Sequence, residues 1–258
     1  AIFNPEDLNA LELALQLKDR YNARVVVATM GPPNAADVLR SALYRGADEA
    51  ILLTDRAFAG ADTLATSYAL SCCAKKYAKY DLILCGRQAI DGDTAQVGPQ
   101  LAEKLAIPQI CYVEDVVELK EKKIVAKRAI EGGYEVLSSP LPALLTVIDS
   151  NEPRPMAGKR IMKYKRAKTR SELSQDYTDA AQVAVEMDNL AARELLIHEW
   201  TAEACDAERN RIGLAGSPTK VKNITSVVLT ASEAKSIEPT EQGVTELIHE
   251  LISDHTLG

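Results

Sequence analysis

The sequence predicts an α/β protein with a doubly wound, mostly parallel sheet, joined to an antiparallel meander and an extended C-terminal arm. Two observations support this fold class. Over residues 1–105, short unbroken apolar runs alternate with segments of helical period, which is typical of parallel strands covered by helices on both faces. After Pro108 the helical segments give way to paired strand-like runs with tight turns, which is typical of antiparallel hairpins.

The parallel part is expected to alternate regularly between helices and strands. Helices are predicted at residues 7–20, 35–44, 63–77 and 93–105, and strands at residues 24–29, 49–53 and 81–85. The run at 24–29 (RVVVAT) is β-branched and unbroken, so we expect a central strand buried on both faces. Asn4 precedes Pro5 and offers a side-chain oxygen that would cap the first helix, while Gly46 would end the second.

The second half of the chain has weaker signals. Strands are predicted at residues 112–119, 123–130 and 140–148, with a glycine turn at 131–134. From residue 151 the chain becomes polar, with helical patches within 171–199 (among them 190–196), a turn at 213–218 and a terminal helix at 243–252. We therefore expect an α/β domain at 1–170 and an arm at 171–258. The arm has too few apolar residues for a core of its own, so it should pack on a partner subunit.

Composition narrows the possible functions. The net charge of −7 argues against a general nucleic-acid binder, which needs a basic face. No apolar run approaches the roughly 20 residues of a membrane span, and no secretory signal opens the chain. The five cysteines are odd in number and lack CxxC spacing, so we expect a reducing, cytoplasmic location. The three histidines are not spaced like a metal site, so no metal is expected.

The strongest local signal is the loop that follows the predicted strand at 81–85, with the sequence GRQAIDGDTAQVGP. In open α/β sheets ligands bind beyond the carboxyl ends of the strands, and this loop lies at such an end. Gly92 would let a ligand approach the backbone closely, and Asp93 or Thr94 would cap a helix whose free amides favour a phosphate. The loop also offers one positive charge and two side-chain amides, at Arg87, Gln88 and Gln96.

Other interpretations of this loop stay open at this point. A plain strand-to-helix turn capped by Asp93 or Thr94 accounts for the same residues about equally well. A magnesium site at Asp91 and Asp93 is a weaker interpretation, because no other carboxylates join them and no Walker motif is present. Catalytic motifs such as GxSxG and HExxH are absent from the sequence, so no catalytic residue is predicted.

Two further segments are candidates for the same site. Met30 and Gly31 follow the predicted strand at 24–29, where they would cover an adenine or ribose or simply form a rigid turn. Residues 4–7 (NPED) would cap a helix or contact a ribose. In the predicted fold these segments converge with the loop at 86–97 on one face, which favours a shared ligand site.

Three long stretches resemble the electron-transfer flavoprotein beta subunit family. The first is FNPEDLNALELALQLKD with VVVATMGPPNAADVLRSALYRGAD, and the second is DLILCGRQAIDGDTAQVGPQLAEKL. The third is KRAIEGGYEVLSSPLPALLTVIDSNEPRPMAGKRIMKYKR, which includes the family's NEPR turn and IMK segment. The resemblance runs from about Asn4 to Arg170, with a weaker match beginning at Arg211. It implies a Rossmann-like, adenine-nucleotide-binding fold.

The resemblance also implies half of a heterodimer with a larger alpha subunit, and a nucleotide pocket within this chain. It carries the pocket onto the following residues: Asn4, Pro5, Glu6, Asp7, Met30, Gly31, Gly86, Arg87, Gln88, Ala89, Ile90, Asp91, Gly92, Asp93, Thr94, Ala95, Gln96 and Val97.

The family has two branches that differ in the nucleotide of this pocket. One branch holds AMP as a structural element and is a simple electron carrier. The other holds a second FAD, takes hydride from NADH and splits the electron pair between a ferredoxin or flavodoxin and an acyl-CoA-type dehydrogenase. The stretch DGDTAQVGP resembles the FAD-holding, bifurcating branch, in which Gly92 would leave room for a diphosphate.

The chain departs from the family pattern in two places. The family begins with a strand and a loop of the KQVPDT kind, and no counterpart precedes Ala1, so we expect the first strand to be missing. Residues 171–210 match poorly, and 200–209 is a candidate for the loop that recognises the dehydrogenase.

Three rival functions share part of this pattern. A universal-stress-like, ATP-sensing module would have the parallel sheet but should lack the meander and the NEPR segment. An ordinary NAD-dependent oxidoreductase should carry a GxGxxG turn, which is absent. A structural subunit with an empty pocket would be compatible with the same sequence.

Overall fold

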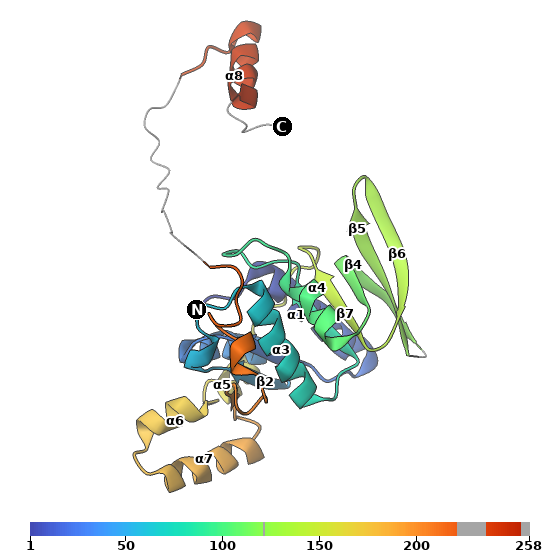
Figure 1. Ribbon diagram of the computed structural model, residues 1–258. Helices are drawn as coiled ribbons and strands as arrows, with labels where there is room; N and C mark the ends of the chain where they lie inside the picture. Colours follow the sequence, from blue (N-terminus) through green and yellow to red (C-terminus); the bar gives the residue numbers. More distant parts are fainter. Residues whose placement is uncertain (121, 221–235, 254–258) are drawn as a thin grey trace. The chain divides into compact units, whose positions relative to one another are not determined.

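The computed structural model describes residues 1–120, 122–220 and 236–253 of the chain (Figure 1). Internal contacts divide the chain into two units, Ala1–Lys220 and Val221–Gly258. The first unit is a mixed α/β structure with two sheets. In the second unit the described residues include helix α8 (Glu241–Ser253), none of whose residues is buried. No helix among these described residues is long and apolar enough to cross a membrane.

Three parallel strands form the first sheet, in the order β1 (Val26–Met30), β2 (Glu49–Leu53) and β8 (His198–Trp200). The middle strand β2 is almost entirely buried, whereas no residue of β1 is fully buried. The expectation of a central strand at 24–29 was therefore wrong in position, because β1 lies at one edge of this sheet. A β-branched run indicates a strand, but its number of neighbours depends on distant segments of the chain.

The second sheet combines parallel and antiparallel pairing. Its strands, in spatial order, are β3 (Leu82–Gly86), β7 (Ala143–Val147), β4 (Gln109–Lys120), β5 (Lys123–Ile130) and β6 (Gly133–Pro140). The first three of these are parallel to one another, and β4, β5 and β6 pair antiparallel as a meander.

The third strand of the meander was predicted wrongly. A turn at 131–134 and a strand at 140–148 were expected there, but the hairpin continues into β6, and residues 143–147 form the parallel strand β7. Every residue of β7 (ALLTV) is buried, which explains its unbroken apolar sequence. In β6 all residues but Ser139 are exposed. The strand therefore needs neither an alternation of apolar and polar residues nor an apolar run, which are the two patterns that predict strands from sequence.

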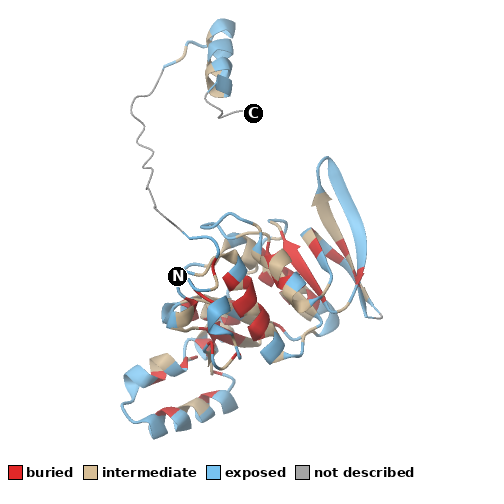
Figure 2. Cartoon of the chain, viewed as in Figure 1, coloured by how far each residue is buried: buried red, intermediate tan, exposed pale blue. Residues whose placement is uncertain are grey.

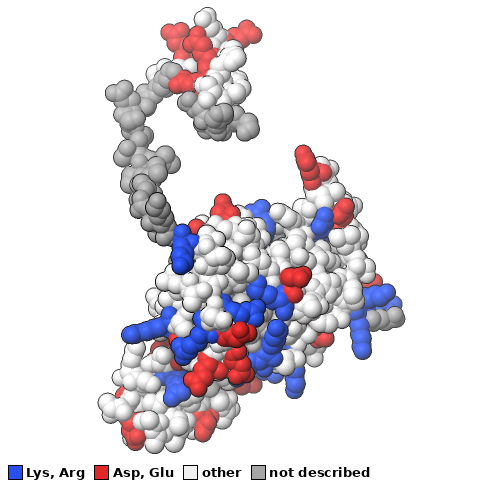
Figure 3. All heavy atoms as spheres, viewed as in Figure 1, with Lys and Arg blue, Asp and Glu red and all other residues white. Residues whose placement is uncertain are grey.

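The helices lie between and beside the two sheets (Figure 1). In the first unit they are α1 (Pro5–Tyr21), α2 (Ala36–Arg45), α3 (Thr63–Tyr77), α4 (Val97–Leu105), α5 (Gly158–Tyr164), α6 (Arg170–Asp176) and α7 (Ala180–Ala192). The α6–α7 hairpin projects from the rest of this unit and is largely exposed, apart from an inner face (Figure 2). On the face drawn in Figure 3, Lys and Arg side chains are interspersed with Asp and Glu.

Helix α1 is the element that joins the two sheets. Leu11 and Leu15 pack into a cluster with α2 and β2, whereas Leu13 and Leu17 pack into a second cluster with β4, β5 and β7. Burial of each such leucine contributes about 1.5–3 kcal/mol. Since α1 is buried on two faces, its first turn is held firmly against the second sheet, and that turn carries the predicted site residues 4–7.

Residues that the sequence assigns to the C-terminal arm complete the first unit. Besides β8, the segment after Trp200 packs on α3, where the guanidinium of Arg211 lies 3.9 Å from the ring centre of Tyr68. The Tyr68 hydroxyl accepts a hydrogen bond from the backbone amide of Glu208 at 3.2 Å. Lys76 of α3 lies 5.1 Å from the ring centre of Trp200. The single tryptophan therefore packs between the sheet and α3.

Candidate functional site

The loop with the strongest sequence signal connects β3 to α4. Strand β3 ends at Gly86 and α4 begins only at Val97, so the helix expected from residue 93 starts four residues later. Asp93 and Thr94 do not cap it: the N-cap position is Gln96, whose side chain makes no capping bond. The carboxylate of Asp93 instead accepts a hydrogen bond from the side-chain amide of Gln88, and Asp93 itself is in the left-handed region with φ 50°.

The base of this loop is bonded to the first turn of α1. Asp7 Oδ1 accepts from the Gly86 amide at 2.6 Å, and Glu6 Oε2 accepts from the Gln88 amide at 2.9 Å. Glu6 Oε1 also forms an ion pair with Arg87 at 2.8 Å. Glu6 and Asp7 therefore act on the loop directly, through carboxylates that accept hydrogen bonds from its amides.

Asn4 occupies the N-cap position of α1, as predicted, but its side chain makes no capping bond. It reaches across to the loop instead. Its Nδ2 donates to the Gln88 carbonyl at 2.9 Å, and its Oδ1 accepts from the Ile90 amide at 3.1 Å. The expected helix cap was therefore wrong, because an amide and a carbonyl of the loop compete for the same side chain.

Replacement of Asn4 by alanine should loosen the loop without unfolding the protein. Both bonds to the loop would be lost, and we expect a decrease in unfolding free energy of about 1 kcal/mol per bond and faster hydrogen exchange at the Ile90 amide. Exchange measured by NMR checks this prediction. Asn189→Ala, on the exposed surface of α7, is the matched control. Unchanged protection of Ile90 in the Asn4 variant would show that the side chain does not hold the loop.

Two glycines let backbone elements approach closely here. A Cβ on Gly86 would lie 2.7 Å from the amide nitrogen of Asp7, and one on Gly98 would lie 2.7 Å from Cγ2 of Thr146. The absence of a side chain at Gly86 therefore lets β3 approach α1, and its absence at Gly98 lets α4 pack closely against β7. Gly92 is different, since a Cβ there would meet no atom within 4 Å and its φ is not positive. Nothing in the described chain therefore requires a glycine at position 92.

The carboxyl of Asp7 is unusually deep for an ionisable group. Burial raises its pKa above the ordinary value, although its hydrogen bonds from Gly86 and Asn4 act in the opposite direction. Its stabilising contribution is therefore greatest at low pH and is lost as the pH rises through the raised pKa. The hydrogen bonds to Gly86 and Asn4 partly offset the cost of its burial.

The middle of the loop faces solvent. Residues 89–94 are exposed, and the backbone amides of Asp91, Gly92 and Thr94 donate to no acceptor within the described part of the chain. Asp93 and Ala95 both have positive φ values, 50° and 52°. An alanine gains no side-chain bond in this conformation, which costs about 1–2 kcal/mol. Such strain together with unpaired amides is typical of loops that are completed by a ligand.

The N-termini of two helices meet beside the loop. Asp62 caps α3 by accepting from the Ala65 amide, and Thr63 Oγ1 donates to Gln96 Oε1 at 2.8 Å. The start of α3 is thus held against the start of α4. Helix N-termini carry a partial positive charge that favours an anion. The sequence interpretation did not include Thr63, because only the tertiary structure places it next to Gln96.

Met30 and Gly31 lie at the carboxyl end of β1, as predicted. The Gly31 amide donates to the Leu53 carbonyl at 3.0 Å. Within the described residues, however, no hydrogen bond or ion pair connects Met30 or Gly31 to the loop at 86–97. The structure therefore joins residues 4–7 to the loop directly, and places the pair at 30–31 at the end of a strand in the other sheet.

Only some of the hydrogen-bond donors of the Arg87 guanidinium have an acceptor. One of its terminal nitrogens pairs with Glu6, whereas its Nε is buried and has no hydrogen-bond partner. Its guanidinium carbon lies 5.8 Å from the ring centre of Tyr112, a residue that the sequence interpretation did not single out. A buried donor without an acceptor is costly. The arginine would therefore gain from an arrangement in which an anion supplies that acceptor.

Residues 1–172 match the family model of the electron transfer flavoprotein domain. The chain belongs to the electron transfer flavoprotein family. It is 42% identical over 256 residues to the electron transfer flavoprotein subunit beta of Clostridium acetobutylicum, covering 99% of this chain and 87% of the relative. This confirms the resemblance to beta subunits drawn from the sequence stretches.

Two other relatives of this electron transfer flavoprotein chain carry different names. The caffeyl-CoA reductase-Etf complex subunit CarD of Acetobacterium woodii is 54% identical over 164 residues, covering 63% of this chain and 62% of the relative. Protein FixA of Bradyrhizobium diazoefficiens is 40% identical over 254 residues, covering 96% of this chain and 79% of the relative.

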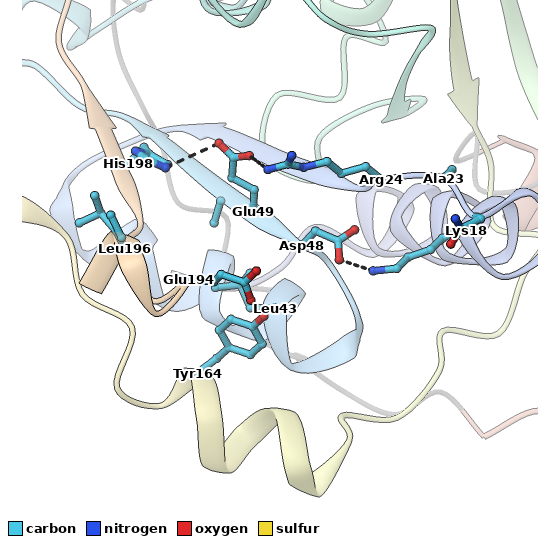
Figure 4. Close-up of a pocket in the computed structure, with 13 residues that line it drawn as sticks. Lys18, Ala23, Arg24, Leu43, Asp48, Glu49, Tyr164, Glu194, Leu196 and His198 are labelled. Atoms are coloured by element: carbon cyan, nitrogen blue, oxygen red, sulfur yellow. Dashed lines mark hydrogen bonds and ion pairs between the residues drawn. The ribbon is translucent and has the colours of Figure 1, made fainter. Parts of the chain in front are cut away.

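A cavity of this flavoprotein chain lies away from the predicted site. It has a volume of about 530 Å³ and opens at the amino ends of β1, β2 and β8, beside the C-terminal end of α1 (Figure 4). Its charges are largely paired: Lys18 with Asp48, and Glu49 with both Arg24 and His198. The loop at 86–97 contacts the other end of the same helix, and none of the predicted site residues lines the cavity.

The cysteines of this flavoprotein chain are free thiols in the structure. Burial raises the pKa of Cys73 to about 12 and that of Cys205 to about 11, and it also raises the pKa of Cys85. These thiols therefore stay protonated near neutral pH and are poor nucleophiles or metal ligands. Across the described residues, no three His, Cys, Asp or Glu side chains gather as a metal site.

Proposed function

We propose that this chain is the small subunit of a heterodimeric electron-transfer flavoprotein, and that it binds FAD at the loop between β3 and α4. In this proposal it accepts hydride from NADH and passes electrons to an acyl-CoA-type dehydrogenase and to a ferredoxin or flavodoxin. Membership of the family and the name "subunit beta" of a 42% identical relative support a two-subunit protein. The name of the 54% identical relative supports a CoA-thioester reductase as partner.

The observation that carries the nucleotide proposal is a loop that is anchored at its base but has backbone amides without acceptors in its middle. Its base is bonded to α1 by Glu6 and Asp7, while the amides of Asp91, Gly92 and Thr94 lack acceptors. Phosphate oxygens would satisfy such amides, and the open space at Gly92 would let them approach. The residues present therefore fit a nucleotide with a phosphate or diphosphate group.

Each part of the loop would have a distinct task in holding the nucleotide. The backbone amides and the N-termini of α3 and α4 would bind the phosphates. Arg87, whose Nε has no partner, would add a charged donor. The exposed carboxylate of Asp91 would accept from ribose hydroxyls. Asn4, Glu6 and Asp7 would border the nucleotide and keep the loop in place.

A bound flavin would supply the electron-transfer chemistry itself. The task of the chain is then to orient the nucleotide and to set its electrostatic surroundings. We further propose that the two sheets belong to a doubly wound, Rossmann-like architecture and that the protein works in the cytoplasm. We also propose that the arm of residues 171–258 contacts the alpha subunit, although its residues up to Lys220 also pack within the first unit of this chain. The apolar stripe of α8, which includes Val244, Ile248 and Ile252, is exposed and supports packing of that arm on a partner.

The decisive experiment is a nucleotide count on the purified complex with the alpha subunit. Acid-released nucleotides are separated and quantified against protein. Two FAD per heterodimer is the expected result. One FAD and one AMP would support the alternative, a simple carrier with structural AMP. One FAD with no second nucleotide would contradict nucleotide binding by this chain and leave a structural subunit.

Replacement of Gly92 by valine should separate binding from folding. Because no atom of the chain lies within 4 Å of the added Cβ, the unfolding free energy should stay within about 0.5 kcal/mol of the wild-type value. The side chain would occupy the space proposed for the diphosphate, so FAD affinity should fall about tenfold or more, equivalent to about 1.4 kcal/mol. Isothermal titration calorimetry and urea unfolding measure the two quantities.

Gly133→Val is the control for this substitution, because a Cβ at Gly133 also meets no atom within 4 Å and the residue begins β6, away from the loop. It should leave both affinity and stability unchanged. Equal FAD affinity in wild type and Gly92→Val would place the diphosphate elsewhere.

A further inference from the structure

Tyr112 has a backbone conformation that its residue type disfavours. It lies in a β-bulge of β4, where the register with β7 shifts between Ile110 and Val113, and its φ is +62°. A bulky side chain in this region is a genuine outlier. Other non-glycine residues with positive φ, such as Asn22, Ala78 and Ala106, end helices, where a left-handed residue is common. Tyr112 ends no helix.

The surrounding structure holds Tyr112 in place. Its amide donates to Thr146 Oγ1 of β7 at 3.2 Å, and beyond the bulge the Ile148 amide donates to the Val113 carbonyl at 3.1 Å. The bulge thus turns the side chain while both flanks of β4 stay paired with β7. Bulges beside functional sites commonly aim a side chain in this way.

The ring of Tyr112 is both exposed and flanked by a cation. The residue is 44% exposed, and the guanidinium carbon of Arg87 lies 5.8 Å from its ring centre. Arg87 is the second residue of the candidate loop, and Glu6 holds it there. Tyr112 therefore stands beside the loop that carries the unpaired amides, in the first half of β4 and level with the carboxyl ends of β3 and β7.

We propose that Tyr112 is a stacking platform for a planar conjugated ring of the nucleotide bound at the loop between β3 and α4. This inference rests on the proposed function and adds a residue to its site. An exposed aromatic ring next to a guanidinium offers a flat apolar surface and a positive charge, and both suit a planar conjugated ring that is linked to a phosphate. Binding would then account for the strain at position 112, because the contact with Arg87 is the one ring interaction that the structure gives Tyr112 among the described residues.

The test compares Tyr112→Gly and Tyr112→Phe in the complex with the alpha subunit, after removal of its dissociable nucleotide. Glycine removes the ring and suits a positive φ, so the fold should be at least as stable as wild type. Phenylalanine keeps the stacking surface. We expect FAD affinity to fall about tenfold to a hundredfold in Tyr112→Gly and to stay near wild type in Tyr112→Phe. Flavin fluorescence should be less quenched in the glycine variant.

Two matched variants control for side effects. Lys122→Gly relieves another positive φ, +63°, in the turn between β4 and β5. Tyr134→Ala removes another exposed tyrosine, which has Lys127 at 4.5 Å from its ring centre, from β6. Neither residue lies in the candidate loop, so both variants should bind FAD as the wild type does.

Titration with AMP in place of FAD identifies the ring. If Tyr112→Gly loses affinity for FAD alone, the ring that stacks on Tyr112 is the isoalloxazine. If it loses affinity equally for FAD and AMP, the ring is the adenine. Either result supports the platform. Unchanged FAD and AMP affinities in Tyr112→Gly overturn it, as does weakened subunit association without a change in affinity. If Gly92→Val weakens binding while Tyr112→Gly does not, the platform fails and the proposed function stands. If the wild-type complex binds neither nucleotide, both fail.

Discussion

Arg154→Ala is expected to lower the unfolding free energy by about 3–5 kcal/mol, because it leaves the buried carboxylate of Glu12 without a counter-charge. The Glu12 side chain is only 7% exposed. Arg154 Nε and Nη2 lie 2.9 and 3.0 Å from the two Glu12 oxygens, and the Arg154 amide donates to Oε2 at 3.0 Å. This fork joins the NEPR turn to α1, the helix that connects both sheets.

The pH dependence of this variant follows from the pKa of Glu12. Burial by itself would raise that pKa, but the hydrogen bonds and charge of Arg154 outweigh burial, so the pKa is lowered. The pair therefore stabilises the fold above the pKa of an unfolded glutamate, and the stabilisation is lost as the pH falls through the lowered folded pKa. In Arg154→Ala only the hydrogen bonds from the backbone amide of position 154 and from Gln16 still oppose burial, so the pKa of Glu12 should be higher than in the wild type and protonation of Glu12 would help folding. The difference in unfolding free energy between the wild type and Arg154→Ala should therefore become smaller as the pH falls.

Urea unfolding between pH 4 and 8 measures both effects. Arg128→Ala, which removes one partner of the more exposed Arg128–Glu135 pair, is the matched control and should cost at most about 1 kcal/mol. The double variant Glu12→Gln with Arg154→Ala should be more stable than Arg154→Ala alone, because no buried charge is left unpaired. A loss below 1 kcal/mol in Arg154→Ala at pH 7 would refute the argument.

Gly86→Ala is expected to reduce both stability and nucleotide affinity. Its Cβ would lie 2.7 Å from the Asp7 nitrogen and 2.8 Å from the Glu6 carbonyl carbon, distances that require the backbone to move. Overpacking of this kind costs about 1–3 kcal/mol. The displaced turn would move Glu6 and Asp7 away from the loop amides whose hydrogen bonds they accept. The base of the loop would then no longer be anchored to α1.

Unfolding by urea and FAD titration of the complex with the alpha subunit check this second prediction. Gly133→Ala, which introduces a methyl group into open space, should change neither quantity. The comparison with Gly92→Val is informative, since that variant should lose affinity alone. If Gly86→Ala kept wild-type stability, the close approach of α1 to β3 would not be the reason for glycine at this position.

Most individual elements could be predicted because their signals are local. The predicted bounds of α3, β2 and β5 agree with the structure residue for residue. In each case a run with one clear period is bounded by turn residues. The position of the candidate loop after a strand was predicted on the same basis, and Gly86, where the loop begins, does end β3. The expectation that this strand is buried was wrong, because β3 lies at the edge of its sheet and only Gly86 in it is buried.

Errors arose where a residue had a choice between partners that the local sequence does not reveal. Asn4 was expected to cap its own helix and instead bonds to Gln88 and Ile90. Asp93 was expected to cap α4 and instead accepts from Gln88, so the helix starts later. Tyr112 and Thr63 were not noticed, since neither differs in sequence pattern from an ordinary strand or helix residue.

By itself, the sequence determined the family, the alternation of helices and strands, and the loop most suited to a ligand, because periodicity and motifs are properties of neighbouring residues. Only the tertiary structure decided the order of the strands, with β7 between β3 and β4 and β8 beside β2. It also decided that Glu6 and Asp7 anchor the loop and that Arg87 lies beside Tyr112. These arrangements depend on packing between segments far apart in the sequence, such as β2 and β8, and the free energy of that packing is not encoded in any short stretch of the chain.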